Sequence, residues 1–263
     1  MKNKSLASGI MIIGFFAVIA LLAAWISPYD PSAIDQESLL RQPSVAHWFG
    51  TDGLGRDILS RMIYGARISL SIGLVAVGIA TALGLLLGAI SGYYGGVVDS
   101  LIMRFVDIML CFPTFYAILA VVAIRGPSIM NIMVIIGLTS WMGPARLIRG
   151  EILSLKEREF IQAARSIGAS PARIIVRHLI PNGAGPVLVN MTMGIAGAIL
   201  IESGLSFLGL GVQPPVPSWG NILIEAKSTL GVAWWITIFP GVAILMTIMG
   251  FYCIAEGLKK VFR

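Results

Sequence analysis

The sequence predicts an all-α integral membrane protein with six transmembrane helices. Of its 263 residues, 57% are hydrophobic and only 12% are charged, whereas about a quarter of the residues of a soluble domain are charged. Several apolar stretches reach the roughly 20 residues that a helix needs to cross a bilayer. Lipid is therefore an expected partner, and the net charge of +6 first indicates membrane topology rather than nucleic-acid binding.

The first expected span covers residues 5–27, which carry no charge. A cleaved signal peptide is the competing interpretation, but the apolar run is longer than usual for one. The polar segment 28–66 follows and contains a glycine-rich stretch at 47–57. A phosphate-binding loop is disfavoured there, because no Gly-Lys-Ser/Thr follows. We expect an external loop rich in turns.

The remaining chain, 67–257, is expected to form the main transmembrane domain, and 258–263 a basic cytoplasmic tail. Its predominantly apolar runs predict the other spans, at 68–98, 101–124, 126–145, 183–201 and 234–255. The second span contains three glycines spaced four residues apart, Gly84, Gly88 and Gly92, and this spacing lets another helix approach closely. Segment 203–224 is also uncharged, but its prolines and glycines forbid one straight helix in lipid. We expect it to be irregular or re-entrant, and external.

Residues 155–182, here called the docking segment, form a long polar stretch between the fourth and fifth spans. A first short helix is expected over 156–167, and Gly168 ends it because glycine adopts the left-handed cap conformation at little cost. One face of this helix carries small or apolar residues at helical spacing, namely Phe160, Ala163, Ala164 and Ile167.

A second short helix is expected after Gly168. Ser170 is predicted to cap it, with Pro171 at its first position and 172–179 continuing it. The sequence Pro181-Asn182-Gly183 is then expected to break the chain before the fifth span. A helix pair with small residues at its centre and basic residues around them suits docking into a groove of a partner, although a solvated basic loop that only fixes topology is the alternative.

The triplet Gln162-Ala163-Ala164, followed by Gly168 and by Leu179-Ile180-Pro181, resembles the EAA loop of bacterial ABC-importer permeases. The resemblance implies a type I ABC-importer transmembrane domain whose loop contacts separate ATP-binding subunits. It assigns docking to Phe160, Gln162, Ala163, Ala164, Gly168, Ala169, Arg173 and Pro181. Gln162 departs from the family pattern, which has Glu here; glutamine keeps the hydrogen-bonding capacity but loses the charge.

Segments 47–57 and 205–220 resemble the dipeptide, oligopeptide and nickel branch of that family, as its second permease. The resemblance implies import of small peptides, with a chelated nickel complex as the alternative. It also implies three kinds of protein partner: a second related permease, two ATP-binding subunits and an extracytoplasmic substrate-binding protein.

No motif of an enzyme occurs in the chain. It lacks the Gly-x-x-x-x-Gly-Lys-Ser/Thr cradle, a His-Glu-x-x-His motif and a Ser-His-Asp order, and it has only two histidines and two cysteines. We therefore expect no enzyme and no cofactor in this chain, with ATP bound by the partner subunits. An ion-coupled transporter or channel would predict inverted repeats or a polar ring within the spans, and neither is visible; a scaffold without transport is a third possibility.

The distribution of basic residues predicts the orientation. With both termini inside, thirteen of the nineteen Lys and Arg residues lie on the same side as the docking segment. The positive-inside rule therefore places the docking segment and both termini in the cytoplasm, and the resemblance makes the membrane a bacterial cytoplasmic membrane.

Two acidic residues are candidates for the substrate pathway, because charges at membrane depth are costly and often functional. Asp107 follows Arg104 by one helical turn, so a structural ion pair between them is the alternative. Glu202 lies near the outer end of the fifth span, where contact with interfacial water is the alternative. Glu256 is expected to pair with the basic tail.

Overall fold

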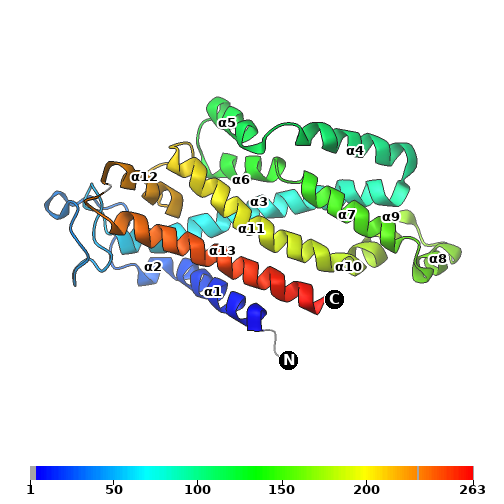
Figure 1. Cartoon of the computed structure of the whole chain (residues 1–263), viewed down its shortest axis with the longest axis horizontal. Coiled ribbons are helices and arrows are strands. Elements are labelled where there is room, and N and C mark those ends of the chain that lie inside the picture. The colour runs from blue at the N-terminus through cyan, green and yellow to red at the C-terminus, as the bar shows by residue number, and fades with distance from the viewer. Residues whose placement is uncertain (1–3, 230, 263) are drawn as a thin grey trace.

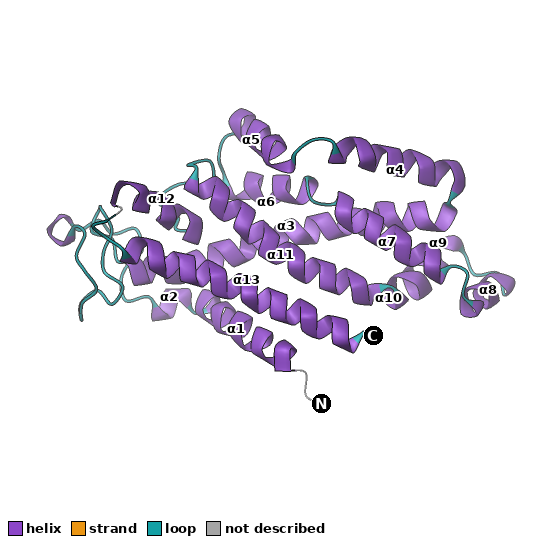
Figure 2. Cartoon of the chain, viewed as in Figure 1, coloured by secondary structure: helices purple, strands orange, loops and turns teal. Residues whose placement is uncertain are grey.

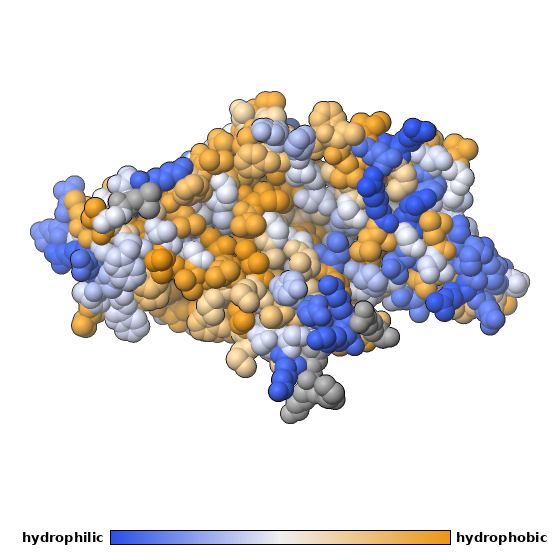
Figure 3. Space-filling view, in the orientation of Figure 1, coloured by the Kyte–Doolittle hydropathy of each residue, from blue (hydrophilic) through white to orange (hydrophobic). Residues whose placement is uncertain are grey.

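The computed structural model describes residues 4–229 and 231–262, and the regular elements of this part of the chain are all helices (Figure 1, Figure 2). The all-α prediction is therefore confirmed. Figure 3 shows a hydrophobic middle zone between two more hydrophilic ends, which is the surface expected of a protein that crosses a bilayer.

Within residues 4–229 and 231–262, four helices are long and apolar enough to cross a membrane, namely α1 (Lys4–Leu21), α3 (Ile58–Tyr94), α11 (Ala184–Phe207) and α13 (Trp235–Val261). Two further spans are bent pairs, namely α4 (Gly96–Leu110) with α5 (Thr114–Arg125), and α6 (Ile129–Leu138) with α7 (Met142–Leu155). The bends are 77° and 40°. The six predicted spans are present if each pair counts as one, but the third and fourth are broken. Pro113 lies at the first break and lacks the N–H that a continuous helix needs.

Two boundaries differ from the sequence-based expectation. Helix α3 begins at Ile58 rather than at residue 68, because the Asp57 side chain caps it by accepting from the Ser60 N–H at 2.8 Å. The loop expected over 28–66 therefore ends at Asp57. Helix α11 continues to Phe207, and α12 (Trp219–Thr229) follows, so the irregular segment expected at 203–224 is confined to 208–218.

The elements divide between two ends of the bundle (Figure 1). One, the loop end, carries the loop at 27–57 with the short η1 (Gln36–Ser38), and α12. The other, the hairpin end, carries the docking segment. Short α2 (Ala23–Ile26) follows α1, and α1 runs along α13 so closely that a Cβ on Gly9 would lie 2.6 Å from the Gly250 carbonyl oxygen. A Cβ on Gly185, at the start of α11, would lie 2.8 Å from Phe262 Cγ, so the end of α13 lies toward the hairpin end, and the start of α1 points the same way (Figure 1).

The predicted glycine stripe is confirmed as the contact between α3 and α7. A Cβ on Gly84 would lie 2.5 Å from Pro144 Cβ, and one on Gly88 would lie 2.5 Å from the Ala145 carbonyl oxygen. Gly92 meets the Arg149 carbonyl oxygen at 3.0 Å in the same way. The absence of side chains at these positions lets the two backbones touch.

We predict that Gly88→Ala destabilises the fold by about 1–3 kcal/mol, because the added methyl group forces α3 away from the α7 backbone. Gly78→Ala is the matched control, since its Cβ would meet nothing within 4 Å on the same helix. Thermal unfolding in detergent measures both variants. Equal melting temperatures would show that the stripe does not set the packing of α3 on α7.

Candidate functional site

The docking segment folds as a compact helical hairpin at the hairpin end. It contains α8 (Glu159–Ser166), α9 (Pro171–Ile174), a π-helical turn η2 (Ile175–Leu179) and α10 (Ile180–Asn182). Three predictions about its turn are confirmed. Gly168 has φ +79°, Ser170 Oγ accepts from the Arg173 N–H at 3.4 Å, and Pro171 stands at the first position of α9.

The ends of the hairpin differ from the prediction. Helix α8 starts at Glu159 rather than at residue 156. The expected break at Pro181-Asn182-Gly183 is wrong, because α10 runs through Pro181 and only Gly183 separates it from α11. A proline near the start of a helical turn loses no hydrogen bond, so the chain stays helical. The docking segment is therefore connected to α11 by nearly continuous helix.

The inner face of the hairpin is anchored on the bundle. Ile161, Ala164, Ile174 and Leu179 are buried in one hydrophobic cluster with Ala89 of α3 and with Ile148 and Ile152 of α7. The Arg165 guanidinium lies over the Tyr93 ring, 5.4 Å from its centroid. Arg149 forms a bidentate ion pair with Asp99, at 2.5 and 2.6 Å, which ties α7 to α4 nearby. A force applied to the hairpin therefore reaches α3, α7 and α11.

The outer face of α8 is open. Phe160 is 42% exposed and Ile167 is 85% exposed, with Ala163 exposed between them. The expectation that Ala164 shares this face is wrong, because Ala164 is 6% exposed and points into the cluster. Among the other predicted docking residues, Ala169 is half-buried and the rest are exposed, namely Gln162, Gly168, Arg173 and Pro181.

Asp107 pairs with a residue of another helix. Its carboxylate accepts from the Arg146 guanidinium of α7, so the alternative of an ion pair with Arg104 is wrong in its partner. Both side chains of the observed pair are more than half exposed. The pair links α4 to α7. Glu256 pairs with Lys259 at 3.7 Å, as predicted.

Glu202 lies fully buried on α11, so the alternative that it reaches interfacial water is wrong. Its Oε1 accepts from the hydroxyls of Ser206 at 2.7 Å and Ser218 at 2.8 Å, and its Oε2 accepts from Ser69 at 3.3 Å. Each hydroxyl in turn accepts a backbone N–H, so its proton faces the carboxylate. Glu202 thereby joins α11 to α3 and to the segment that precedes α12.

We predict that Glu202→Leu destabilises the fold by at least about 3 kcal/mol, because three buried hydroxyls lose their acceptor. Glu202→Gln keeps the oxygen that serves Ser206 and Ser218, and is expected to cost about 1 kcal/mol. Thermal unfolding of the purified chain compares them. If the two variants lose equal stability, the negative charge rather than the hydrogen bonds holds this site together.

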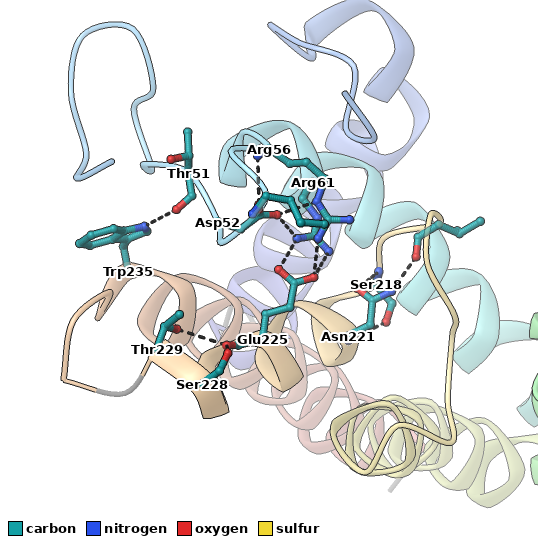
Figure 4. A network of polar contacts seen from close by, with 12 residues as sticks. Thr51, Asp52, Arg56, Arg61, Ser218, Asn221, Glu225, Ser228, Thr229 and Trp235 are labelled. Carbon is teal, nitrogen blue, oxygen red and sulfur yellow. Dashed lines mark hydrogen bonds and ion pairs between the residues drawn. The ribbon is translucent and has the colours of Figure 1, made fainter. Parts of the chain in front are cut away.

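A larger polar cluster at the loop end was missed by the sequence analysis (Figure 4). Arg61 of α3 donates to Glu225 of α12 at 2.7 and 2.8 Å and also to Asp52. Arg56 donates to Asp52 at 2.8 Å and to Glu225 at 2.7 Å. Trp235 Nε1 donates to the Thr51 carbonyl nearby, at 2.9 Å. The cluster fastens the loop at 27–57 to α12.

The sequence held two signals for this cluster. Asp52 and Arg56 are four residues apart, and Glu225 is the only acidic residue in 203–233. Neither signal gives the partner across more than 160 residues of chain, so the pairing needed the structure. The cluster and Glu202 tie separate elements together, whereas the outer face of the docking segment is exposed.

Comparison with known proteins agrees with this architecture. Residues 84–262 match the family model of binding-protein-dependent transport system inner membrane components, and residues 1–43 match the N-terminal transmembrane domain of oligopeptide transport permease C. The dipeptide transport system permease protein DppC of Alkalihalophilus pseudofirmus is 42% identical over 258 residues, which cover 98% of this chain and 85% of DppC.

A second relative supports the same family, and a solved structure supports the same fold. The glutathione transport system permease protein GsiD of Escherichia coli is 42% identical over 259 residues, which cover 98% of this chain and 85% of GsiD. The methionine ABC transporter MetNI, in an inward-facing conformation, shares the fold with a TM-score of 0.56 at 16% identity, over 76% of this chain and 94% of the other. The chain therefore belongs to the family of binding-protein-dependent transport system inner membrane components, the permease subunits of ABC importers.

Proposed function

We propose that this chain is the permease subunit of an ATP-driven importer of small peptides in a bacterial cytoplasmic membrane. The relatives DppC and GsiD are named for dipeptide and glutathione transport, and glutathione is itself a tripeptide. Neither name favours the nickel alternative. The remaining subunits are a second permease, two ATPase subunits and an extracytoplasmic binding protein.

The observation that carries the coupling proposal is the two-faced docking segment. Its inner face is buried against α3 and α7, whereas Phe160, Ala163 and Ile167 stay open on its outer face. An ATPase groove that takes the outer face pulls on a hairpin that is continuous with α7 and α11. These helices then tilt as rigid bodies, which is a common route to alternating access.

The orientation of the proposal follows from charge. The hairpin end carries most of the basic residues, and the start of α1 and the end of α13 point toward it. The positive-inside rule places this end in the cytoplasm, where ATP is hydrolysed. A reporter protein inserted within residues 156–177 is expected to be found on the cytoplasmic side of the membrane. Detection of the reporter outside the cell would contradict the proposed orientation.

Reconstitution tests the function. The chain is coexpressed with the permease, ATPase and binding-protein genes that neighbour its own, and the complex is placed in liposomes. We expect ATP-dependent uptake of labelled di- and tripeptides, and loss of co-purified ATPase when residues 162–168 are disrupted. Uptake of a nickel chelate without peptide uptake would favour the nickel alternative. Uptake by the isolated chain without any ATPase would favour an ion-coupled transporter or channel.

A further inference from the structure

Two hollows adjoin along one side of α11. The first, of about 330 Å³, lies between α3, α6, the start of α7 and α11 in the middle of the bundle. The second, of about 660 Å³, lies between α7, α11 and α13 toward the hairpin end. Asn190 and Met193 line both hollows, so together they form one groove along 185–201. We call this the α11 groove.

The middle part of the α11 groove is uncharged and mostly apolar, with three polar side chains in its wall. Thr81, Ser140 and Asn190 line it together with glycine, alanine and aliphatic residues, and no charged side chain of the described residues lines it. Charges are found only at the hairpin end of the groove, where Glu256, Lys259 and Lys260 line the larger hollow.

Thr81 is the second sign of a binding surface. It is 4% exposed, lines the middle hollow, and its Oγ1 has no hydrogen-bond partner among the described residues. An unpaired hydroxyl at such depth costs free energy, although a helical threonine usually satisfies itself on the carbonyl four residues earlier. This hydroxyl is thus unpaired, within the described part of the chain, at the wall of the groove.

The groove also has a boundary at the loop end. Ile201 is the last residue of α11 that lines it, and the next residue, Glu202, ties α11 to Ser69 of α3 and to Ser218. The groove therefore leads from this tie toward the hairpin end, which is the end proposed to face the cytoplasm.

We propose that the α11 groove is this chain's part of the peptide pathway and that its uncharged middle part contacts peptides through their backbone rather than through side-chain charge. This inference rests on the proposed peptide import. Every peptide presents the same backbone N–H and C=O groups, which Thr81, Ser140 and Asn190 can bind. A fixed charge would hold peptides of opposite charge too tightly for release and repel the others. Neither Asp107 nor Glu202, the two acidic candidates, lines the groove.

Gly197 provides a steric test. Its Cβ would meet nothing within 4 Å although it lines the middle hollow, so Gly197→Leu fills the groove without a clash in this chain. Gly241→Leu on α13 is the matched control, because Gly241 is equally free of neighbours and lies outside the groove. In the reconstituted complex, Gly197→Leu is expected to lower peptide uptake at least about tenfold, a barrier of about 1.4 kcal/mol, with the ATPase still co-purified.

Asn190 provides a test that leaves the shape unchanged. Asn190→Asp adds one negative charge, and the uptake ratio of a lysine-containing to a glutamate-containing tripeptide is expected to rise on the order of tenfold. An uncharged tripeptide serves as the internal reference. Asn190→Leu is expected to lower uptake of all three peptides alike.

The outcomes separate this inference from the proposed function. If the wild-type complex imports all three tripeptides but Gly197→Leu is as active as Gly241→Leu, or Asn190→Asp leaves the ratio unchanged, the groove is not the pathway and peptide import stands. If the wild-type complex imports no peptide, the proposed function fails and this inference fails with it.

Discussion

Replacing Gly168 by leucine is expected to lower ATP-driven uptake at least about tenfold, which a docking penalty of about 1.4 kcal/mol suffices to produce. Gly168 has φ +79°, and its Cβ would meet nothing within 4 Å of this chain. The local strain of about 1–2 kcal/mol leaves the bundle folded. Gly168 is exposed just after α8, so the leucine adds bulk where the proposed ATPase groove has to close. Uptake and co-purified ATPase measure the effect.

Gly126 supplies a control of the same backbone geometry. It also has φ +79°, and a Cβ added there would meet nothing within 4 Å, but it stands between α5 and α6 and away from the docking segment. Gly126→Leu is therefore expected to strain its turn equally and to transport like the wild type. Equal loss in both variants would assign the effect to backbone strain, and wild-type transport by Gly168→Leu would overturn the docking proposal.

Local chemistry made the docking segment predictable. A left-handed glycine, a serine cap and a proline at the first helical position each act within four residues of chain, so Gly168, Ser170 and Pro171 could be assigned from the sequence. The small residues of α3 were predictable for a similar reason, because a four-residue repeat fixes a helix face. What each face contacts was not predictable, and Ala164 consequently points inward.

The sequence analysis could not predict ion pairs between residues that lie far apart in the chain. Arg61 was expected in the external loop because it lies within the polar segment 28–66. In the structure, Asp52 and Glu225 neutralise it, so α3 includes it and begins at Ile58. Asp107 likewise pairs with Arg146 on another helix instead of Arg104 one turn away. Spacing in the sequence can identify candidate ion-pair partners on the same helix, but not partners on another helix.

The cluster at the loop end is expected to give the largest loss of stability. Asp52 is 0% exposed and accepts from Arg56 and from Arg61, which is itself 1% exposed. Asp52→Ala leaves two arginines to share Glu225, and removing one partner of a buried pair costs about 3–5 kcal/mol. Asp107→Ala is the control, because its exposed pair with Arg146 is worth about 1 kcal/mol or less. Thermal unfolding in detergent measures both, and equal losses would contradict the prediction.

A double variant shows whether charge burial causes this loss. In Asp52→Ala the cost arises chiefly because the Arg61 guanidinium stays buried with one acceptor removed. Adding Arg61→Leu removes that charge, so Asp52→Ala/Arg61→Leu should lose clearly less stability than the sum of the two single variants. Simple additivity would mean that the residues stabilise the fold independently. A coupled result would mean that the loop at 27–57 and α12 are held together by one shared set of charges.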